Sequence, residues 1–442
     1  MSPSKTLAIV GVLVAASLAA NQPAAEAKKP SRRGPSFRPH VVVATLDTGT
    51  NPFHPTWRRD ERRHPSKYIP GYPTSARRLA LRLGDGYAAD VKASRTAFEN
   101  LSKEKAFPYW VPGTNLVGLW AHETDAKPIF DHEQAASSNA THSHGAAASS
   151  QIAGRGYGMA PGVYLVVVDT ESDEGQDAYK TNGEALRWAA DQPWIDIIHT
   201  NIQDPVPLNN EQGALWKNYP DALRYAVDKG KLVVSPGGNF YAEPTETSPH
   251  AGPPGVLAAG ANDNCGYADF SNPDPHVVMD GYGTVAAAPN GYGDTSFGGT
   301  SGSSPRITGY AAQLLLRIRR SFGYRGNTAD GTLVMLPKKK RPVEGPLADG
   351  NLTAAELHEV IRKTANPNPH ESKYDGDQVL GCIPQPTDLP ASFYPKMGYG
   401  EVSEHTIDAA FEVAIGKSPM QSRRIEDQFY GISEELRALF WD

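Results

Sequence analysis

The sequence contains only two cysteines, no excess of basic charge and, after its first 20 residues, no long apolar run. Two cysteines exclude a disulfide-stapled scaffold and a zinc site built from four cysteines. The 43 Lys and Arg residues stand against 49 Asp and Glu residues, a net charge of −6, which argues against a nucleic-acid partner. No later apolar run approaches the ~20 residues that span a bilayer, so we expect no membrane span in the mature chain.

The remaining composition is that of a loop-rich chain with a substantial core. Hydrophobic residues make up 39% of the sequence, and 42 Gly plus 37 Pro account for 79 of 442 residues. This share lies below the roughly 25–30% that marks low-complexity disorder. Length alone suggests two or three domains at about 150 residues each.

The first residues have the pattern of an export signal. Lys5 precedes a 15-residue apolar run, Thr6–Ala20, and Ala25-Glu26-Ala27 follows as a small-x-small cleavage site. We predict a signal peptide over residues 1–27, cleavage near Ala27, and a secreted protein. The alternative, a short membrane anchor, is disfavoured because the run is too short to span a bilayer. Residues 28–39 are predicted to form a basic flexible arm.

Export affects the interpretation of the two cysteines, Cys265 and Cys382. In an oxidising compartment they form either one structural disulfide or two buried thiols. Their separation in sequence leaves both alternatives open.

Apolar runs and helical patterns alternate along the chain, which predicts an α/β fold with a mainly parallel sheet flanked by helices. Predicted strands cover residues 40–46, 163–168, 195–198, 232–234 and 256–261. Predicted helices cover residues 184–190, 221–229 and 307–320.

Three motifs carry polar residues suited to catalysis. Asp47-Thr48-Gly49 closes the first predicted strand, where open α/β sheets place their ligand sites. A single Asp-Thr-Gly argues against an aspartic protease, which needs two carboxylates sharing a proton. The second motif, Ser143-His144-Gly145, opens a stretch of small residues that is predicted to be a tightly packed helix with His144 at its N-terminus.

The third motif, Phe297 to Pro305, leads into the apolar helix. Its glycines permit a sharp turn, and Pro305 is expected in a first helical turn. Ser301 would then lie beside the positive end of a helix. The alternative without a catalytic role is a Ser/Gly loop that ends in a helix N-cap. Position 303 is Ser, so the motif is not the G-x-S-x-G elbow of α/β-hydrolases.

Together, the order Asp47, His144, Ser301 and the residues around them resemble the subtilisin-like serine proteases, or subtilases. The resemblance extends from about Val41 to Ala410 and implies a three-layer subtilisin-like fold. It indicates one catalytic domain over residues 40–416, with an insertion at about 58–139 and a C-terminal extension over 417–442. The sequence Gly237-Gly238-Asn239 after an apolar strand matches the family's oxyanion-hole asparagine, which nominates Asn239.

The resemblance implies a secreted serine endopeptidase acting on protein or peptide substrates without a catalytic cofactor. Ser301 would attack the peptide carbonyl, His144 would transfer the proton, and Asp47 would orient His144. Asn239 and the Ser301 N–H would stabilise the oxyanion. Two alternatives stay open: a non-proteolytic binding protein on the same scaffold, and an enzyme that transfers the acyl group to an amine.

The sequence departs from the family pattern at several positions. Gly302 replaces the usual Met after the serine, and Gln203 stands where a glycine usually lines the specificity pocket, which suggests a narrower specificity. The insertion carries Tyr and Trp residues and is interpreted as a lid, a substrate-binding wall or a solvated decoration. No recognisable folded propeptide follows the signal, so a maturation partner is one explanation. Structural calcium is frequent in the family, but no acidic cluster here marks a metal site.

Overall fold

A computed structural model of the chain describes most of the region between residues 38 and 420. The described residues are 38–99, 108–121, 144–170, 178–201, 218–239, 253–263, 266–268, 270–272, 275–323, 331–366, 370–375, 378–384 and 398–420. The predicted signal peptide, most of the basic arm and most of the C-terminal extension lie outside them and stay predictions.

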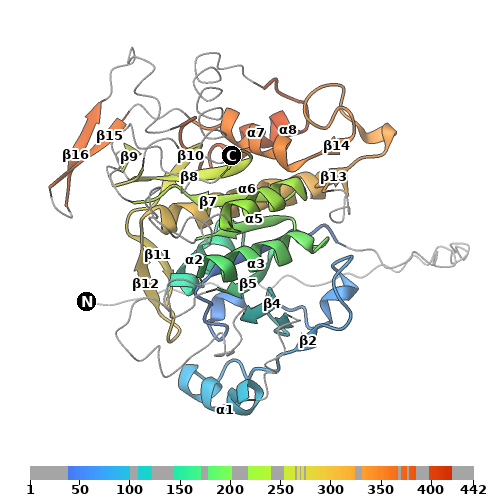
Figure 1. The fold of residues 1–442 in the computed structure, drawn as a ribbon, viewed down its shortest axis with the longest axis vertical. Helices are drawn as coiled ribbons and strands as arrows, with labels where there is room; N and C mark the ends of the chain where they lie inside the picture. The colour runs from blue at the N-terminus through green and yellow to red at the C-terminus, as the bar shows by residue number, and fades with distance from the viewer. Residues whose placement is uncertain are drawn as a thin grey trace, which may run out of the picture. The chain divides into compact units, whose positions relative to one another are not determined.

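A mainly parallel sheet forms the centre of the fold (Figure 1). In the described part of the chain the strand order is β16-β15-β9-β8-β7-β6-β1-β5-β4-β3-β2, with β10 also paired to β8. The parallel strands of its core are β4 (Leu116–Ala121), β5 (Tyr164–Asp169), β1 (Val42–Asp47), β6 (Ile197–Thr200), β7 (Leu232–Pro236), β8 (Val256–Asp263) and β10 (Val277–Asp280).

Shorter strands extend the edges of this sheet or form separate pairs. The edge strands are β2 (Arg77–Arg78), β3 (Tyr109–Trp110), β9 (Gly266–Tyr267), β15 (His370–Asp375) and β16 (Gln378–Pro384). The separate antiparallel pairs are β11 (Thr284–Ala287) with β12 (Asp294–Phe297), and β13 (Val334–Met335) with β14 (Asn351–Leu352).

Helices cover both faces of the sheet, which confirms the predicted three-layer α/β class. Residues of α3 (Ala178–Asp191) and α5 (Asn218–Asp228) share one hydrophobic cluster with one face of the strands. Residues of α2 (His144–Ala153), α6 (Thr300–Phe322), α7 (Ala354–Lys363) and α8 (Ile407–Ala414) share a second cluster with the opposite face. Helix α1 spans Tyr87–Glu99, and 3₁₀ turns occupy Pro55–Trp57, Pro65–Lys67 and Lys338–Lys340.

Strand β1 shows why the sequence selects this arrangement. All six of its residues are buried, with Val43 facing one cluster and Val42 and Ala44 the other. A strand that is buried on both faces has a nearly continuous apolar sequence rather than an alternating one. In β1 only Thr45 and Asp47 are polar. Its carboxyl end delivers Asp47 to the edge of the sheet, where ligand sites of parallel sheets form.

Two expectations from the sequence need correction. Helix α6 begins at Thr300, seven residues before the predicted start at Ile307, so Pro305 lies inside the helix rather than in its first turn. The stretch taken as an insertion also contains β4, which pairs in parallel with β5 inside the sheet. Trp110 and Trp120 from this stretch are buried against the same cluster as β1, so this part of the stretch is not a solvated decoration.

Candidate active site

The loop after β1 and the start of α2 meet through two glycines. The Gly145 N–H donates a 2.9 Å hydrogen bond to Thr48 Oγ1. A Cβ atom at position 145 would overlap the carbonyl oxygen of Gly49, so only glycine permits this approach. The contact explains the glycine that follows His144, and it brings the ends of β1 and α2 together. Gly49 has a φ of 92°, a left-handed conformation that glycine adopts without strain.

This contact places His144 against Asp47. Nδ1 of the imidazole lies 2.9 Å from Asp47 Oδ1 and 3.0 Å from Oδ2. Asp47 is only 4% exposed, whereas the His144 side chain is 32% exposed. The His144 ring packs edge-to-face against the Phe297 ring, with 5.0 Å between the ring centroids. Because Nδ1 donates to the carboxylate, Nε2 is the basic nitrogen of the ring.

The environment of Asp47 favours its charged form. Burial alone would raise the pKa of this carboxyl, but the neighbouring His144 and the hydrogen bonds from His144 and the Thr48 N–H outweigh it and lower the pKa. The Thr48 N–H donates to Oδ1 at 2.7 Å. Asp47 is therefore an anion at neutral pH, suited to holding an imidazole in one orientation.

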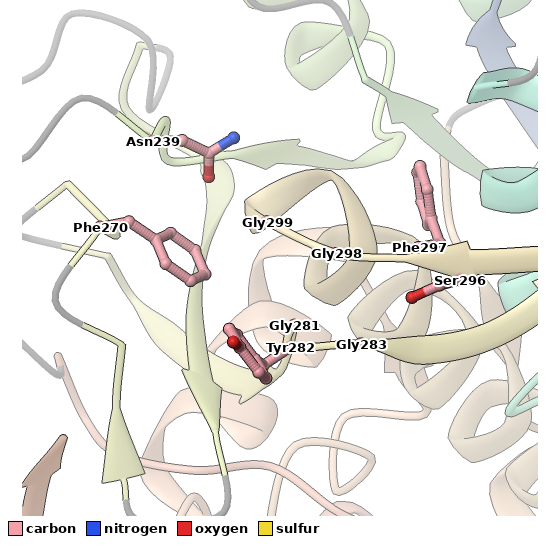
Figure 2. Close-up of a pocket in the computed structure, with 9 residues that line it drawn as sticks. All are labelled: Asn239, Phe270, Gly281, Tyr282, Gly283, Ser296, Phe297, Gly298 and Gly299. Atoms are coloured by element: carbon pink, nitrogen blue, oxygen red, sulfur yellow. The ribbon is translucent and has the colours of Figure 1, made fainter. Parts of the chain in front are cut away.

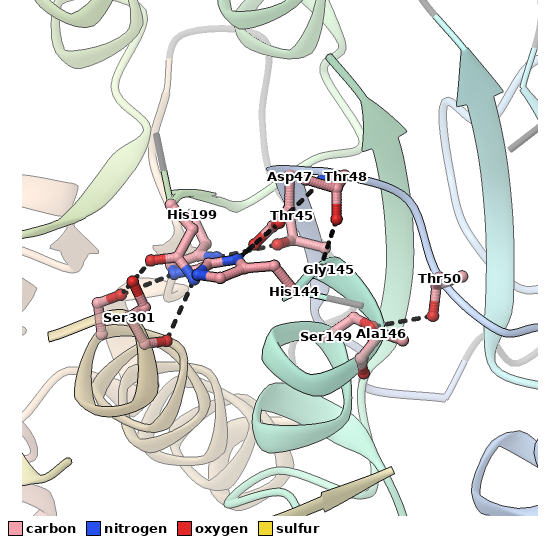
Figure 3. A network of polar contacts seen from close by, with 12 residues as sticks. Thr45, Asp47, Thr48, Thr50, His144, Gly145, Ala146, Ser149, His199 and Ser301 are labelled. Carbon is pink, nitrogen blue, oxygen red and sulfur yellow. Dashed lines mark hydrogen bonds and ion pairs between the residues drawn. The ribbon is translucent and has the colours of Figure 1, made fainter. Parts of the chain in front are cut away.

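Ser301 is the second residue of α6 and is 7% exposed. Gly299 precedes the helix with a φ of 76°, a left-handed conformation that glycine adopts without strain. In the view of Figure 3, the His144 ring lies between Asp47 and Ser301. The N-terminal end of a 23-residue helix is a positive region that favours negative charge near Ser301.

Asn239 lies on the other side of the same turn (Figure 2). Its Oδ1 accepts hydrogen bonds from the Thr300 N–H at 2.7 Å and from the Thr300 hydroxyl at 2.9 Å. These two bonds fix which end of the amide is oxygen, so that Nδ2 is held as a donor beside the Gly299–Ser301 turn. The structure thus brings all four nominated residues, Asp47, His144, Ser301 and Asn239, to the start of α2 and α6.

Residues 38–376, more than half of the chain, match the model of the subtilase family. The chain belongs to the subtilase family. Curated relatives include subtilisin-like protease 7 of Trichophyton equinum, 26% identical over 222 residues that cover 47% of this chain and 54% of the relative.

A second relative, subtilisin-like protease 4 of Arthroderma benhamiae, is 26% identical over 177 residues, covering 39% of this chain and 43% of the relative. This subtilase therefore spans about half the length of the curated relatives that it matches. Similar solved structures include the prenylagaramide maturation protease PagA, with a TM-score of 0.47, 19% identity and coverage of 87% of this chain and 96% of that one. Another is the epidermin leader peptide processing serine protease EpiP from Staphylococcus aureus, with a TM-score of 0.48, 14% identity and coverage of 86% and 76%.

A cavity of about 460 Å³ opens beside the Ser301 turn of the subtilase (Figure 2). Its wall consists of Asn239, Phe270, Gly281, Tyr282, Gly283, Ser296, Phe297, Gly298 and Gly299. Gly302 lies beside the wall: a Cβ there would sit 3.7 Å from Gly281 Cα and from the Phe297 carbonyl oxygen. A side chain at position 302 would therefore contact two residues of the cavity wall, Gly281 and Phe297.

Sequence reasoning missed His199 and Asn201, which lie under the Ser301 turn. Asn201 Nδ2 donates to the Ser301 carbonyl at 3.1 Å, and the fully buried His199 ring bonds Thr45 and Ser304. The signal available was the run of three polar residues, His199 to Asn201, that follows Ile197 and Ile198 at the end of strand β6. Buried polar side chains need partners, so such a run predicts a hydrogen-bonded network.

Several expectations fall on residues outside the described part of the chain. Gln203 and Cys265 belong to this group, so the narrowed specificity pocket stays a prediction, and both alternatives for Cys265 and Cys382 stay open. Among the described residues, no group of three His, Cys, Asp or Glu side chains is arranged to hold a metal ion, and structural calcium stays unplaced. None of the described helices combines the length and apolar character required to cross a membrane.

Proposed function

We propose that this subtilase is a serine endopeptidase in which Ser301 is the nucleophile. The observation that carries the proposal is the Asp47–His144 pair, with Nδ1 of the imidazole 2.9 and 3.0 Å from the two carboxylate oxygens, beside a serine at the start of α6. A hydrogen-bonded acid–imidazole pair next to a hydroxyl is the arrangement that activates a serine.

The proposed reaction begins with proton transfer from Ser301 Oγ to His144 Nε2 as Oγ attacks the peptide carbonyl. Asp47 holds the ring through Nδ1–H and stabilises the imidazolium that forms. His144 then gives the proton to the leaving amine, the peptide bond breaks, and an acyl-enzyme ester forms on Ser301. Water, activated by the same imidazole, hydrolyses the ester and regenerates the enzyme.

The negative charge on the tetrahedral intermediate is assigned to two donors, Asn239 Nδ2 and the Ser301 N–H. This role for Asn239 is supported by the two hydrogen bonds that its Oδ1 accepts from Thr300, because they orient the amide with Nδ2 as the remaining donor. The α6 N-terminus adds a favourable dipole at the same place. One such donor is typically worth ~3–4 kcal/mol of the barrier.

Protein or peptide segments are the proposed substrates, and the cavity beside Asn239 is assigned to a side chain on the leaving-group side. Phe297 forms part of its wall and also packs against His144, the residue that protonates the leaving amine. The aromatic wall from Phe270, Tyr282 and Phe297 favours an apolar or aromatic side chain there.

We also propose that the enzyme acts outside the cell. The support is the sequence pattern of residues 1–27, a Lys followed by an apolar run and a small-x-small site at Ala25–Ala27.

Labelling with a fluorophosphonate tests the proposal, since the reagent modifies only a serine that an adjacent base activates. The folded wild-type protein should be labelled at Ser301, as located by peptide mass analysis, and Ser301→Ala should take no label. Ser303→Ala is the matched control, because Ser303 lies in the same turn but donates to the Thr300 carbonyl. It should label normally, and a folded wild type without label would refute the proposal.

A further inference from the structure

The chain contains a buried histidine that the proposed catalytic steps do not use. His199 lies on β6 and is fully buried, and both of its ring nitrogens are hydrogen-bonded. Thr45 Oγ1 lies 2.9 Å from Nδ1, and Ser304 Oγ lies 3.0 Å from Nε2. Figure 3 shows the His199 ring beside Thr45 and the turn that carries Ser301.

The direction of these hydrogen bonds follows from the donors available. Ser304 Oγ donates its single proton to Asn201 Oδ1 at 3.2 Å, so it can only accept from His199 Nε2. His199 is therefore the Nε2–H tautomer, and Nδ1 accepts from the Thr45 hydroxyl. Asn201 Nδ2 completes the series by donating to the Ser301 carbonyl at 3.1 Å. Four hydrogen bonds thus run in one direction from Thr45 to Ser301.

Pro305 explains why Ser301 needs this donor. In an α-helix the carbonyl of residue 301 would accept from the N–H of residue 305, but proline has no N–H. The side-chain amide of Asn201 takes the place of that missing donor. The first turn of α6 is therefore held partly from outside the helix, by β6.

The tautomer requires a neutral ring. Burial lowers the pKa of His199 to about 3, although the nearby Asp47 opposes the shift and His144 adds to it. A doubly protonated ring would need an acceptor at Nδ1, where the Thr45 hydroxyl now donates. A pKa of about 3 keeps the His199 ring neutral at neutral pH, so the series of bonds is intact there.

We propose that His199 is a positioning residue that couples the strand of Asp47 to the helix of Ser301. Thr45 stands two residues before Asp47 on β1, and Ser304 stands one turn after Ser301 on α6. The coupling fixes the Ser301 backbone, and with it the hydroxyl and the N–H that face the substrate. Such control matters because catalytic groups must be held within about 0.5 Å of productive geometry. The inference rests on the proposed function of Ser301.

Two matched pairs of variants test the coupling through the rate of fluorophosphonate labelling. Ser304→Ala breaks the series, whereas Ser303→Ala removes a buried hydroxyl of the same turn that bonds only within α6. Thr45→Val removes the first donor with little change of shape, and Thr45→Ser restores it. We expect Ser304→Ala and Thr45→Val to label ~10-fold or more slowly than wild type. Ser303→Ala and Thr45→Ser should stay within about twofold, with melting temperatures measured for all four.

Rates that follow the melting temperatures alone, or a wild-type rate in Ser304→Ala, would overturn the inference. Histidine ¹⁵N NMR gives a second readout that does not depend on catalysis, with His199→Gln used to assign the resonances. The expected signal at pH 5 is a neutral Nε2–H ring that changes in Thr45→Val. A protonated ring, or the Nδ1–H tautomer, would also overturn it. A wild-type protein that takes no label but shows this NMR signal would refute the proposed function. The hydrogen bonds from Thr45 to Ser301 would then be structural only, and the positioning role would be overturned as well.

Discussion

Two buried ionisable residues lie near each other in the site, and their environments act on them differently. Asp47 keeps its charge because hydrogen bonds and His144 outweigh the effect of burial on its pKa. His199 loses its charge because burial dominates, and its pKa falls to about 3. One residue is therefore an anion and the other a neutral ring, which is what their hydrogen bonds require.

The pKa of His199 predicts a pH dependence of stability. Between pH 6.5 and about 3 the unfolded chain binds a proton at this residue and the folded chain does not. The free energy of unfolding should therefore fall as the pH is lowered through this window, by up to about 1.4 kcal/mol per pH unit from this group.

Urea unfolding at pH 7 and pH 4.5 measures this effect when wild type is compared with His199→Gln. The variant should be less stable than wild type at pH 7, and the difference should shrink at pH 4.5. His40 and His54 also have lowered pKa values, but they are present in both proteins and cancel in the comparison. Equal pH slopes in the two proteins would contradict the assignment of a neutral His199.

At the level of elements, the start of α2 is fixed by contact between Gly145 and Gly49. Gly145→Ala places a methyl group on the Gly49 carbonyl oxygen, so α2 must move away from β1. The His144–Asp47 hydrogen bonds depend on this approach. We expect a fall of about 100-fold in the labelling rate of Ser301, the effect of a displacement of roughly 1 Å in a catalytic group.

Gly293→Ala is the control for this variant. Gly293 lies in the β11–β12 connection, where a Cβ meets no atom within 4 Å. It should label at the wild-type rate. A Gly145→Ala protein that is folded and fully reactive would show that the glycine contact does not set the position of His144.

The sequence predicted the type and order of the helices and strands better than the residues at which they begin and end. The order of strands and helices followed from apolar runs and helical patterns, and the family motifs nominated the four residues that meet at the site. Helix α6 was expected to begin at Ile307 because Thr300–Ser304 has the composition of a loop; it begins at Thr300 because tertiary bonds from Asn239 and Asn201 hold this turn. The Thr45–His199–Ser304 contacts depend on the register of β1 with β6 and on the position of α6, which no local pattern contains.

At the scale of the whole molecule, a buried ion pair joins α6 to the sheet far along the helix from Ser301. Arg319 Nη2 lies 2.7 Å from Asp196 Oδ1, and the two side chains are 0% and 1% exposed. Arg319 also donates to the carbonyls of His40 and Leu333, and Asp196 accepts from the Val42 N–H. The ion pair thus ties α6 to the residues at the starts of β1, β6 and β13.

Arg319→Met should destabilise the protein by about 3–5 kcal/mol, because it leaves the Asp196 carboxylate buried without its partner. Replacing both residues, as Arg319→Met with Asp196→Leu, should cost less than the single change. Arg82→Met is the surface control, since Arg82 and Asp85 are 71% and 67% exposed and such pairs contribute about 0–1 kcal/mol. Denaturant unfolding measures all three, and equal losses for Arg319→Met and Arg82→Met would contradict the buried pair's role.

The anchoring of helix α6 determines how easily Ser301 can be displaced when a substrate binds. Its 23 residues span roughly 35 Å, with Ser301 at one end and Arg319 near the other. The helix therefore acts as a rod anchored at both ends, by side chains from β6 at its start and by the ion pair near its finish. Displacing Ser301 on binding a peptide would therefore require moving a helix that is attached to the sheet at both ends, rather than a loop.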